Sequence, residues 1–216
     1  MASTLYTKYW GPMEFLNRRK RILLDPFYVM MIKAKDRDYE KLARKYGMSL
    51  LTIPNDEIRL VFMPVFDGSA EKADEHWWCL FMDMVKKQFW MIDSLYADPY
   101  EHHAELVTKL VKAVDVLFQV KDPLWELGSL EKWPRHVVGM VKQIDTFSCD
   151  VLMLGCIKHY ARSCSDTSFP LEKNLRNKLF LEDANNSYNE LREKFNDIFP
   201  KECVWTKRTG SSQNTY

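Results

Sequence analysis

A cysteine and a glutamine stand six residues apart in the segment VKQIDTFSCDVLMLG, residues 141–155. Cys149 opens an apolar run that is typical of a buried helix, and a helix N-terminus favours the thiolate form of a cysteine. Gln143 carries an amide that could donate a hydrogen bond to a developing oxyanion. The spacing therefore suggests a thiol nucleophile with its oxyanion donor. A plain turn into a buried helix, with Ser148 as the N-cap, explains the same segment without chemistry.

A thiol nucleophile also needs a base and a group that orients the base, and His76 and Asp93 are the candidates. His76 begins the apolar segment 76–85, and Asp93 falls near the end of a second one, 88–95. Two apolar runs around a short basic break are typical of an antiparallel hairpin, which would return Asp93 to the end of the sheet where His76 lies. Two other interpretations stay open: a histidine satisfied in the core, and an aspartate that merely ends a strand in a turn.

The remaining histidines are weaker candidates for the base. His102 and His103 fall early in an amphipathic helix predicted over 101–120, so we expect both to be exposed to solvent. His159 lies ten residues after Cys149 in the same predicted helix, which places it about 15 Å away by helix rise. The base is therefore best assigned to His76.

The hydrophobic pattern predicts an α+β domain with a mixed sheet. The segment 76–85 is apolar on both alternating faces, which indicates a central strand covered on both sides. Pro64 indicates an edge or the end of a strand, because proline cannot donate to a ladder. The predicted helices are 36–46, 101–120, 149–162 and 183–198, and the predicted strands are 59–66, 76–85, 88–95 and 136–141, with a loop at 121–135.

Composition limits the possible partners and the compartment. The chain has 216 residues and a net charge of +1, so we expect no affinity for nucleic acid or an anionic membrane. Its first residues lack the apolar core of a secretory signal, and its apolar runs are too short to span a bilayer. The five cysteines form no C-x-x-C pair and lie in no zinc-ligand spacing with histidine. We therefore expect free thiols, no metal, and an intracellular protein, nuclear or cytoplasmic.

These motifs together resemble the Ulp1/SENP family of cysteine proteases, which act on SUMO and other ubiquitin-like proteins. The family pattern has a P-I strand, then H-W, a hairpin that ends in Y-x-D-S, and Q-x-N-x-x-D-C-G at a helix start. Here FMPVF matches the first element, HWWCLFMDMVKKQFWMIDSL matches the hairpin, and QIDTFSCDV keeps the spacing from Gln143 to Cys149. The resemblance covers roughly residues 59–164.

The resemblance implies a papain-like, adenoviral-protease-like fold, with a mixed central sheet flanked by helices. It implies a single protease domain over 1–205, no cofactor and a monomer. The polar composition of residues 206–216 separately predicts a disordered tail. The resemblance assigns the general base to His76, its orienting group to Asp93 and the nucleophile to Cys149. Gln143 becomes the oxyanion donor, together with the backbone N–H of Cys149.

By the same resemblance, the substrate is a ubiquitin-like modifier, SUMO first, cleaved after its C-terminal Gly-Gly. Trp77 would line the narrow channel that admits this tail. The first 58 residues show no obvious version of the family's first segment, so the surface that would dock the modifier is unassigned.

Three residues depart from the family pattern. Asp145 stands where the family has Asn, Ser148 replaces the Asp before the cysteine, and Asp150 replaces the Gly after it. Asp150 adds a negative charge to the first helical turn, which stabilises the helix but disfavours a neighbouring thiolate. Two alternatives to an active protease therefore stay open: a weak or inactive module that binds a ubiquitin-like protein, and an acetyltransferase of the same clan.

Overall fold

The computed structural model describes residues 20–34, 37–46, 54–68, 75–163, 169, 174–185 and 193–194. Five strands form one sheet, in which their order in space follows their order in the chain. The two outer pairs of neighbours run parallel and the two inner pairs antiparallel, which confirms the predicted mixed sheet. The strands are β1 (Lys20–Leu23), β2 (Ile58–Asp67), β3 (His76–Asp83), β4 (Gln88–Ile92) and β5 (Arg135–Val137).

The predicted hairpin is formed by β3 and β4, with β3 at the centre of the sheet. Its turn is closed by Asp83, whose carboxylate accepts hydrogen bonds from the amides of Val85 (2.9 Å) and Lys86 (3.0 Å). Lys87 completes the turn in a left-handed conformation, with φ of 53°. The hairpin fixes the register Cys79↔Ile92, so that the residue after β4 lies near the start of β3.

Pro64 shows how an inner strand can contain a proline. β2 lies between β1 and β3, so it is not an edge strand. Its pairing with β1 ends at Leu23↔Phe62, and Pro64 lies beyond that last pair, opposite Cys79 of β3. β2 is therefore an edge only around Pro64, where its described residues have no partner on the β1 side, and a proline is tolerated there because no ladder hydrogen bond is lost.

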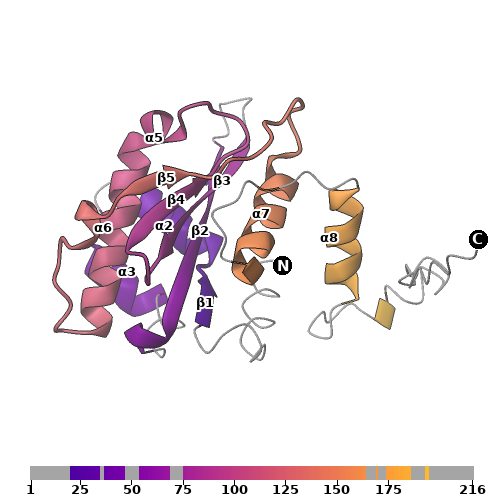
Figure 1. Ribbon diagram of the computed structural model, residues 1–216. Helices are drawn as coiled ribbons and strands as arrows, with labels where there is room; N and C mark the ends of the chain where they lie inside the picture. Colours follow the sequence, from indigo (N-terminus) through magenta and orange to yellow (C-terminus); the bar gives the residue numbers. More distant parts are fainter. Residues whose placement is uncertain are drawn as a thin grey trace, which may run out of the picture.

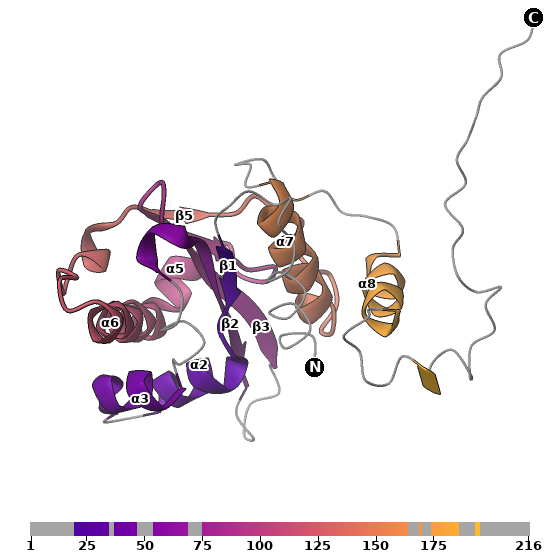
Figure 2. The same ribbon diagram turned by 90° about the horizontal axis from the view of Figure 1, so that it is seen from below.

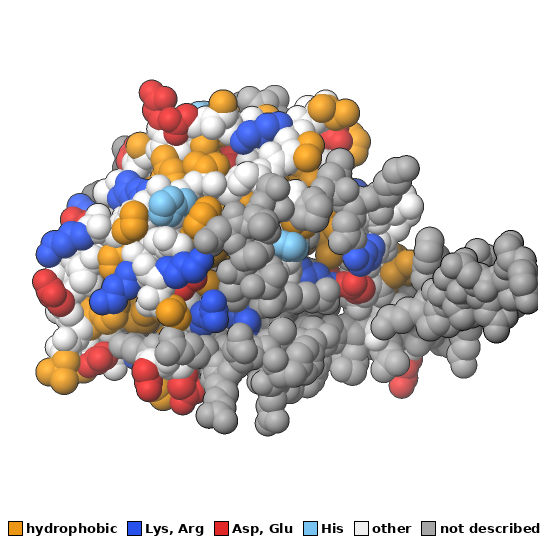
Figure 3. Space-filling view, in the orientation of Figure 1, with side chains coloured by type: hydrophobic (Ala, Val, Ile, Leu, Met, Phe, Trp, Pro, Cys, Tyr) orange, Lys and Arg blue, Asp and Glu red, His pale blue; other side chains and the backbone are white. Residues whose placement is uncertain are grey.

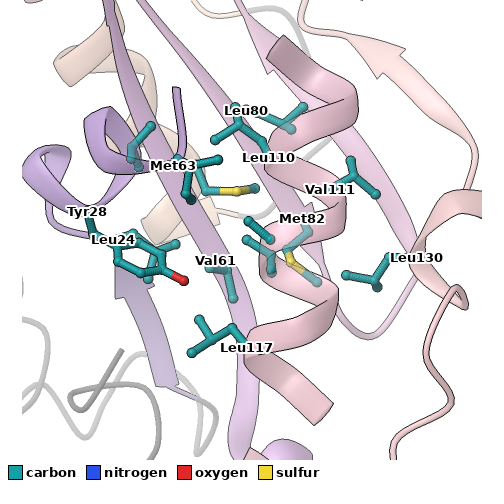
Figure 4. Close-up of a cluster of buried hydrophobic side chains, with 14 of the residues drawn as sticks. Leu24, Tyr28, Val61, Met63, Leu80, Met82, Leu110, Val111, Leu117 and Leu130 are labelled. Atoms are coloured by element: carbon teal, nitrogen blue, oxygen red, sulfur yellow. The ribbon is translucent and has the colours of Figure 1, made fainter. Parts of the chain in front are cut away.

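Helices cover both faces of the sheet (Figures 1 and 2). One face carries α2 (Pro26–Lys33), α3 (Tyr39–Tyr46) and α6 (Ala104–Lys121), while α7 (Cys149–Ser163) packs on the other face with α8 (Leu175–Ala184) beside it. Buried apolar side chains of α6 and the sheet interdigitate on the first face (Figure 4), among them Val61, Leu80, Met82, Leu110 and Leu117. The second cluster contains Phe62, Cys79, Phe81, Cys156 and Ile157.

Two early elements, β1 and α2, were not predicted from the sequence. The start of α2 does carry a local signal, because the Asp25 side chain accepts from the amide of Phe27 at 2.8 Å and Pro26 follows at the first helical position. The helix predicted over 36–46 is confirmed as α3. Most of the helix predicted over 183–198, and the tail 206–216, lie outside the described residues.

The predicted helix over 101–120 is broken in two. A short helix α5 (Pro99–His102) is followed by α6, and His103 stands between them with φ of −100° and ψ of 18°. The predicted loop over 121–135 contains one short 3-10 turn, η2 (Leu130–Lys132). His103 precedes the buried residue Val107 by four positions, so its side chain lies on the face of α6 that packs on the sheet.

The face of the molecule shown in Figure 3 has no single dominant charge. Basic and acidic side chains are interspersed on the face shown in Figure 3, in keeping with the net charge of +1. Within the described part of the chain, no helix combines the length and the apolar character needed to cross a membrane.

Candidate active site

The hairpin brings His76 and Asp93 into contact. The Nε2 atom of His76 lies 3.2 Å from Oδ1 of Asp93, and the two side chains are 2% and 0% exposed. The sequence had placed both groups at one end of the sheet, and the pairing across β3 and β4 puts them there. The Nδ1 atom of His76 is buried and has no hydrogen-bond partner among the described residues. This leaves one ring nitrogen held by the carboxylate and the other available to a substrate or a thiol.

Asp93 also ends the strand, as the alternative interpretation required. Its Oδ1 atom accepts hydrogen bonds from the backbone amides of Leu95 (2.7 Å) and Tyr96 (3.0 Å). These bonds form the local turn that aspartate favours, and they fix the carboxylate from the backbone side. The two interpretations are therefore compatible: one carboxylate closes the turn and contacts the histidine.

The electrostatics keep Asp93 ionised. Burial by itself would raise its pKa, but hydrogen bonds from His103 and His76, with that of the Tyr96 amide, outweigh burial and hold the pKa well below its ordinary value. A buried carboxylate with this many donors is a fixed negative charge at neutral pH. Such a charge can hold an imidazole in one tautomer and stabilise it once protonated.

His103 contradicts its predicted exposure, because only 4% of its surface is exposed. Its Nε2 atom lies 3.0 Å from Oδ2 of Asp93, and its ring stacks on that of Trp78 at 4.2 Å. The prediction was wrong because it took the start of the helix to be solvated, although His103 stands four residues before Val107 and seven before Leu110, on the buried face of α6. This helical spacing was a sequence signal that distinguishes His103 from exposed His102.

Cys149 is the first residue of α7, as predicted, and is 5% exposed. Ser148 occupies the N-cap position, because its carbonyl accepts from the amide of Leu152 at 3.0 Å. The expected side-chain cap is not formed: the Ser148 hydroxyl donates to Asp145 at 2.7 Å. The amide of Val151 is instead satisfied by the carboxylate of Asp150 at 2.7 Å.

Asp145, which stands where the family pattern has Asn, holds the loop before Cys149. Its carboxylate accepts from the backbone amides of Phe147 (3.0 Å) and Ser148 (2.8 Å) as well as from the Ser148 hydroxyl. The hydroxyl hydrogen bond of Ser148 is the main cause that lowers the Asp145 pKa, followed by the two amides and nearby Arg176. Within the described part of the chain these bonds leave the amide of Cys149 without an acceptor, as an oxyanion donor requires.

Gln143 is oriented by three hydrogen bonds. Its Oε1 accepts from the Ser94 hydroxyl at 2.6 Å, and its Nε2 donates to the carbonyl of Asp145 at 3.0 Å. Its own backbone amide donates to the Ser94 carbonyl at 2.8 Å. Because a side-chain amide has two N–H groups, one remains for a further acceptor.

Lys142 ties the same loop to the end of β4. Its Nζ donates to the carbonyl of Asp93 at 3.0 Å and also to the carbonyl of Tyr96. The loop that leads to Cys149 and the segment that carries Asp93 are therefore joined by Lys142 and by the contact between Ser94 and Gln143. In Figure 1 this loop runs along the upper edge of the sheet before the chain enters α7.

The structure does not bring all four predicted groups into direct contact. Within its described residues, Cys149 Sγ shares no hydrogen bond with His76, whose ring centroid lies 5.7 Å from that of Tyr96 and 6.4 Å from that of His103. Catalytic hydrogen bonds are often long in unliganded enzymes and tighten when substrate binds. Trp77 is half-buried with its ring 5.0 Å from that of Phe66, and its place in a substrate channel stays a prediction.

One described group has ligand types that a metal ion could use. The relevant atoms of His76, Asp93 and His103 all lie within 4.8 Å of one another, and all three side chains are buried. Their nitrogens and oxygens already satisfy one another by hydrogen bonds at 3.2 Å and 3.0 Å, which a metal would have to replace. The sequence-based expectation of a metal-free site stays a prediction.

A mixed sheet with a cysteine-bearing helix on one face and a histidine–aspartate pair on its strands is the architecture of the papain-like cysteine peptidases. Within that class the comparison with known families is specific. The model of the Ulp1 protease family, C-terminal catalytic domain, matches residues 1–195. The chain belongs to this family, which confirms the resemblance drawn from the motifs.

Solved structures support the same fold. The SUMO protease Ulp1, with its catalytic cysteine oxidised to a sulfenic acid, has a TM-score of 0.56 and 16% identity, and the match covers 80% of this chain and 70% of that one. The yeast Ulp1 protease domain in complex with Smt3, the yeast ortholog of SUMO, has a TM-score of 0.54 and 17% identity over 77% and 67%. A de-sumoylating protease matches with a TM-score of 0.56 and 12% identity over 93% and 71%. No curated protein sequence matches the chain.

Proposed function

We propose that this chain is a cysteine protease that cleaves after the C-terminal Gly-Gly of a ubiquitin-like modifier, with SUMO as the first candidate. The single observation that carries the proposal is the buried contact at 3.2 Å between His76 and Asp93, which leaves His76 Nδ1 without a partner among the described residues. Family membership and the place of Cys149 at a helix start support the same assignment. The two Ulp1 structures described above support SUMO as the modifier.

The proposed reaction begins when Nδ1 of His76 takes the proton of the Cys149 thiol. The thiolate attacks the carbonyl carbon of the terminal glycine, and the negative charge moves to the carbonyl oxygen. The free N–H of Gln143 and the amide of Cys149 then stabilise this oxyanion. Protonated His76 gives its proton to the leaving amine, and a thioester to Cys149 remains.

Hydrolysis of the thioester completes the cycle. His76 removes a proton from a water molecule, which attacks the same carbonyl carbon, and the thiol leaves with that proton. Asp93 remains ionised throughout, because its hydrogen bonds hold its pKa low. We propose that the modifier's tail, once bound beside Trp77, brings the thiol and the imidazole into hydrogen-bonding contact. A nuclear or cytoplasmic location fits a protease of SUMO conjugates.

One observation favours a second candidate, an inactive module that binds a ubiquitin-like protein without cleaving it. Cys149 and His76 share no hydrogen bond within the described residues, and a carboxylate at Asp150 follows the cysteine directly. That carboxylate lies 3.5 Å from the guanidinium of Arg176, which offsets part of its charge. The offset favours the active protease over the inactive module.

The experiment is covalent labelling with SUMO, Nedd8 and ubiquitin, each bearing a C-terminal electrophile. We expect one modifier to form an adduct with the wild-type chain, and Cys149→Ala to form none. Cys79→Ser, Cys164→Ser and Cys203→Ser are the matched controls and should still label. Tight binding of a modifier without an adduct would establish the inactive module, and an adduct that survives Cys149→Ala would place the nucleophile elsewhere. Acetyl transfer from acetyl-CoA would favour the clan-related acetyltransferase.

A further inference from the structure

The far side of Asp93 from His76 is occupied by a second histidine. Oδ1 of Asp93 serves His76 and two backbone amides, whereas Oδ2 has His103 as its single hydrogen-bond partner among the described residues, at 3.0 Å. The carboxylate is thus held at both oxygens. Neither bond can be lost without leaving a buried charged oxygen or a buried donor unsatisfied, which is costly.

His103 is itself fixed on three sides. Its ring stacks on that of Trp78 at 4.2 Å with an interplanar angle of 16°, and Trp78 is fully buried. Its Nδ1 lies 3.6 Å from the carboxylate of Asp67, and Asp67 pairs with Lys33 at 2.7 Å. Its backbone amide donates to the Pro99 carbonyl at 3.0 Å. The ring therefore has little freedom to rotate away from Asp93.

The carboxylate plane is held by contacts at both oxygens. Rotation about the bond from Cβ to the carboxylate carbon would move Oδ1 away from the turn amides and His76, and would also move Oδ2 away from His103. The donor on Oδ2 therefore adds a restraint at the opposite oxygen, which helps to keep Oδ1 directed at Nε2 of His76. A misplaced carboxylate would misplace the His76 ring, and a displacement of about 1 Å can reduce a rate by about 10²-fold.

We infer that His103 is a positioning residue: its Nε2–H holds the Asp93 carboxylate so that Asp93 fixes the ring of His76 with Nδ1 free for the Cys149 thiol. The inference rests on the proposed protease function for its effect on rate. The hydrogen bonds that it describes are a property of the folded chain itself.

The test uses three variants that differ in where they place a donor. In His103→Gln the side-chain amide nitrogen reaches the position of Nε2, whereas in His103→Asn it reaches only that of Nδ1. His103→Phe keeps an aromatic ring on Trp78 and has no donor. We expect Asn and Phe to lower kcat by about 10- to 100-fold with KM changed less than about 2-fold, and Gln to retain most of the activity. His136→Phe is the control, because His136 is exposed and its ring packs on Trp90 at 4.8 Å.

Two results would overturn the inference. If Gln and Asn variants have the same kcat, the bond through Nε2 does not matter. If His103→Phe raises KM and leaves kcat unchanged, His103 shapes the substrate site and does not position the base. Thermal unfolding of each variant identifies those that fail to fold, and the pair of amide variants still decides the question if the Phe variant is lost.

A second measurement does not require turnover. In protein labelled with ¹⁵N-histidine, the imidazole proton shared by His76 and Asp93 should give a protected downfield NMR signal. We expect this signal to broaden in His103→Phe and His103→Asn and to persist in His103→Gln. An unchanged signal in all three variants contradicts the inference. If the wild-type chain labels with no modifier, the protease proposal fails, while this signal still decides the role of His103.

Discussion

The two halves of the candidate site are built in opposite ways. The half that is packed at the ends of β3 and β4 contains His76, Asp93 and His103 and is closed to solvent, with exposures of 2%, 0% and 4%. The half before α7 lies at the surface, where Ile144 is fully exposed and Phe147 is 67% exposed. Buried side chains surround the first half. The second half is held chiefly by the hydrogen bonds of the Asp145 carboxylate and the Gln143 side-chain amide.

The difference follows from what each half has to do. A charge that must keep one orientation is strongest where water is excluded, because the effective dielectric is low there. In the proposed mechanism, the Cys149 thiol and its oxyanion donors must instead be reached by the tail of a modifier. The contacts between Ser94 and Gln143, and between Lys142 and the Asp93 carbonyl, join the two halves.

The buried half should fail as a unit, which is the largest effect that we expect. Asp93→Asn should lower kcat by about 10³- to 10⁴-fold, because the imidazole of His76 loses the charge that fixes its tautomer. The double variant with His76→Ala should be little worse than His76→Ala alone. Rates on a SUMO substrate with a C-terminal reporter test this. Fully multiplicative losses would mean that Asp93 acts only on the turn.

Substitutions in the exposed half should lower kcat less than substitutions in the buried half. Gln143→Ala is expected to lower kcat by about 10²- to 10³-fold with KM almost unchanged, as for the loss of one oxyanion donor. Ser94→Ala is the matched variant: it removes the hydroxyl that orients the amide at 2.6 Å, and it should show a smaller loss of the same kind. A rise in KM without a change in kcat would show that Gln143 binds substrate or supports the loop.

The buried half should also make the stability of the fold depend on pH, through Asp93. Because the pKa of Asp93 is lower in the folded chain than its ordinary value, ionised Asp93 stabilises the fold above about pH 4, and this contribution is lost as the pH falls through the folded pKa. At pH 7 Asp93→Asn should lower the free energy of unfolding by about 1–3 kcal/mol. Urea unfolding between pH 7 and pH 3 should show that the difference in unfolding free energy between wild type and Asp93→Asn becomes smaller below about pH 4. A gap that is independent of pH would assign the loss to packing.

The smallest effect is expected for Arg176, which contacts the exposed half of the site from α8. Arg176 donates to the carbonyl of Phe147 at 2.7 Å and lies 3.5 Å from the carboxylate of Asp150. Both partners of this ion pair are about half exposed, so the pair is worth on the order of 0.5 kcal/mol. Arg176→Gln should lower kcat/KM about 2- to 5-fold, and the difference from wild type should shrink in high salt. A loss above about 50-fold would show that the exposed half depends on α8 far more than its contacts indicate.

The sequence predicted best what depends on short-range periodicity. The two apolar runs around a short basic break predicted the hairpin of β3 and β4 and so placed His76 near Asp93, and the apolar run after Cys149 predicted α7. It failed at two other residues. His103 shares the buried face of α6 with Val107 and Leu110, a helical spacing that was overlooked, and Arg176 reaches the loop before Cys149 from an element whose helical pattern was not recognised. The signal at Asp25 and Pro26, a side-chain cap followed by proline, was present and would have identified α2.

The buried cysteines of the second core cluster have a practical consequence. Cys79 and Cys156 pack between the sheet and α7, and burial raises the pKa of both thiols far above the ordinary value. An alkylating reagent therefore reaches them only when the fold opens, whereas Cys149 stands at the helix start beside an exposed loop. In one time course, modification of Cys149 reports local opening of the site, and modification of Cys79 and Cys156 reports global unfolding. The chain's own cysteines therefore report local opening of the site and global unfolding separately, with no cysteine introduced by mutation.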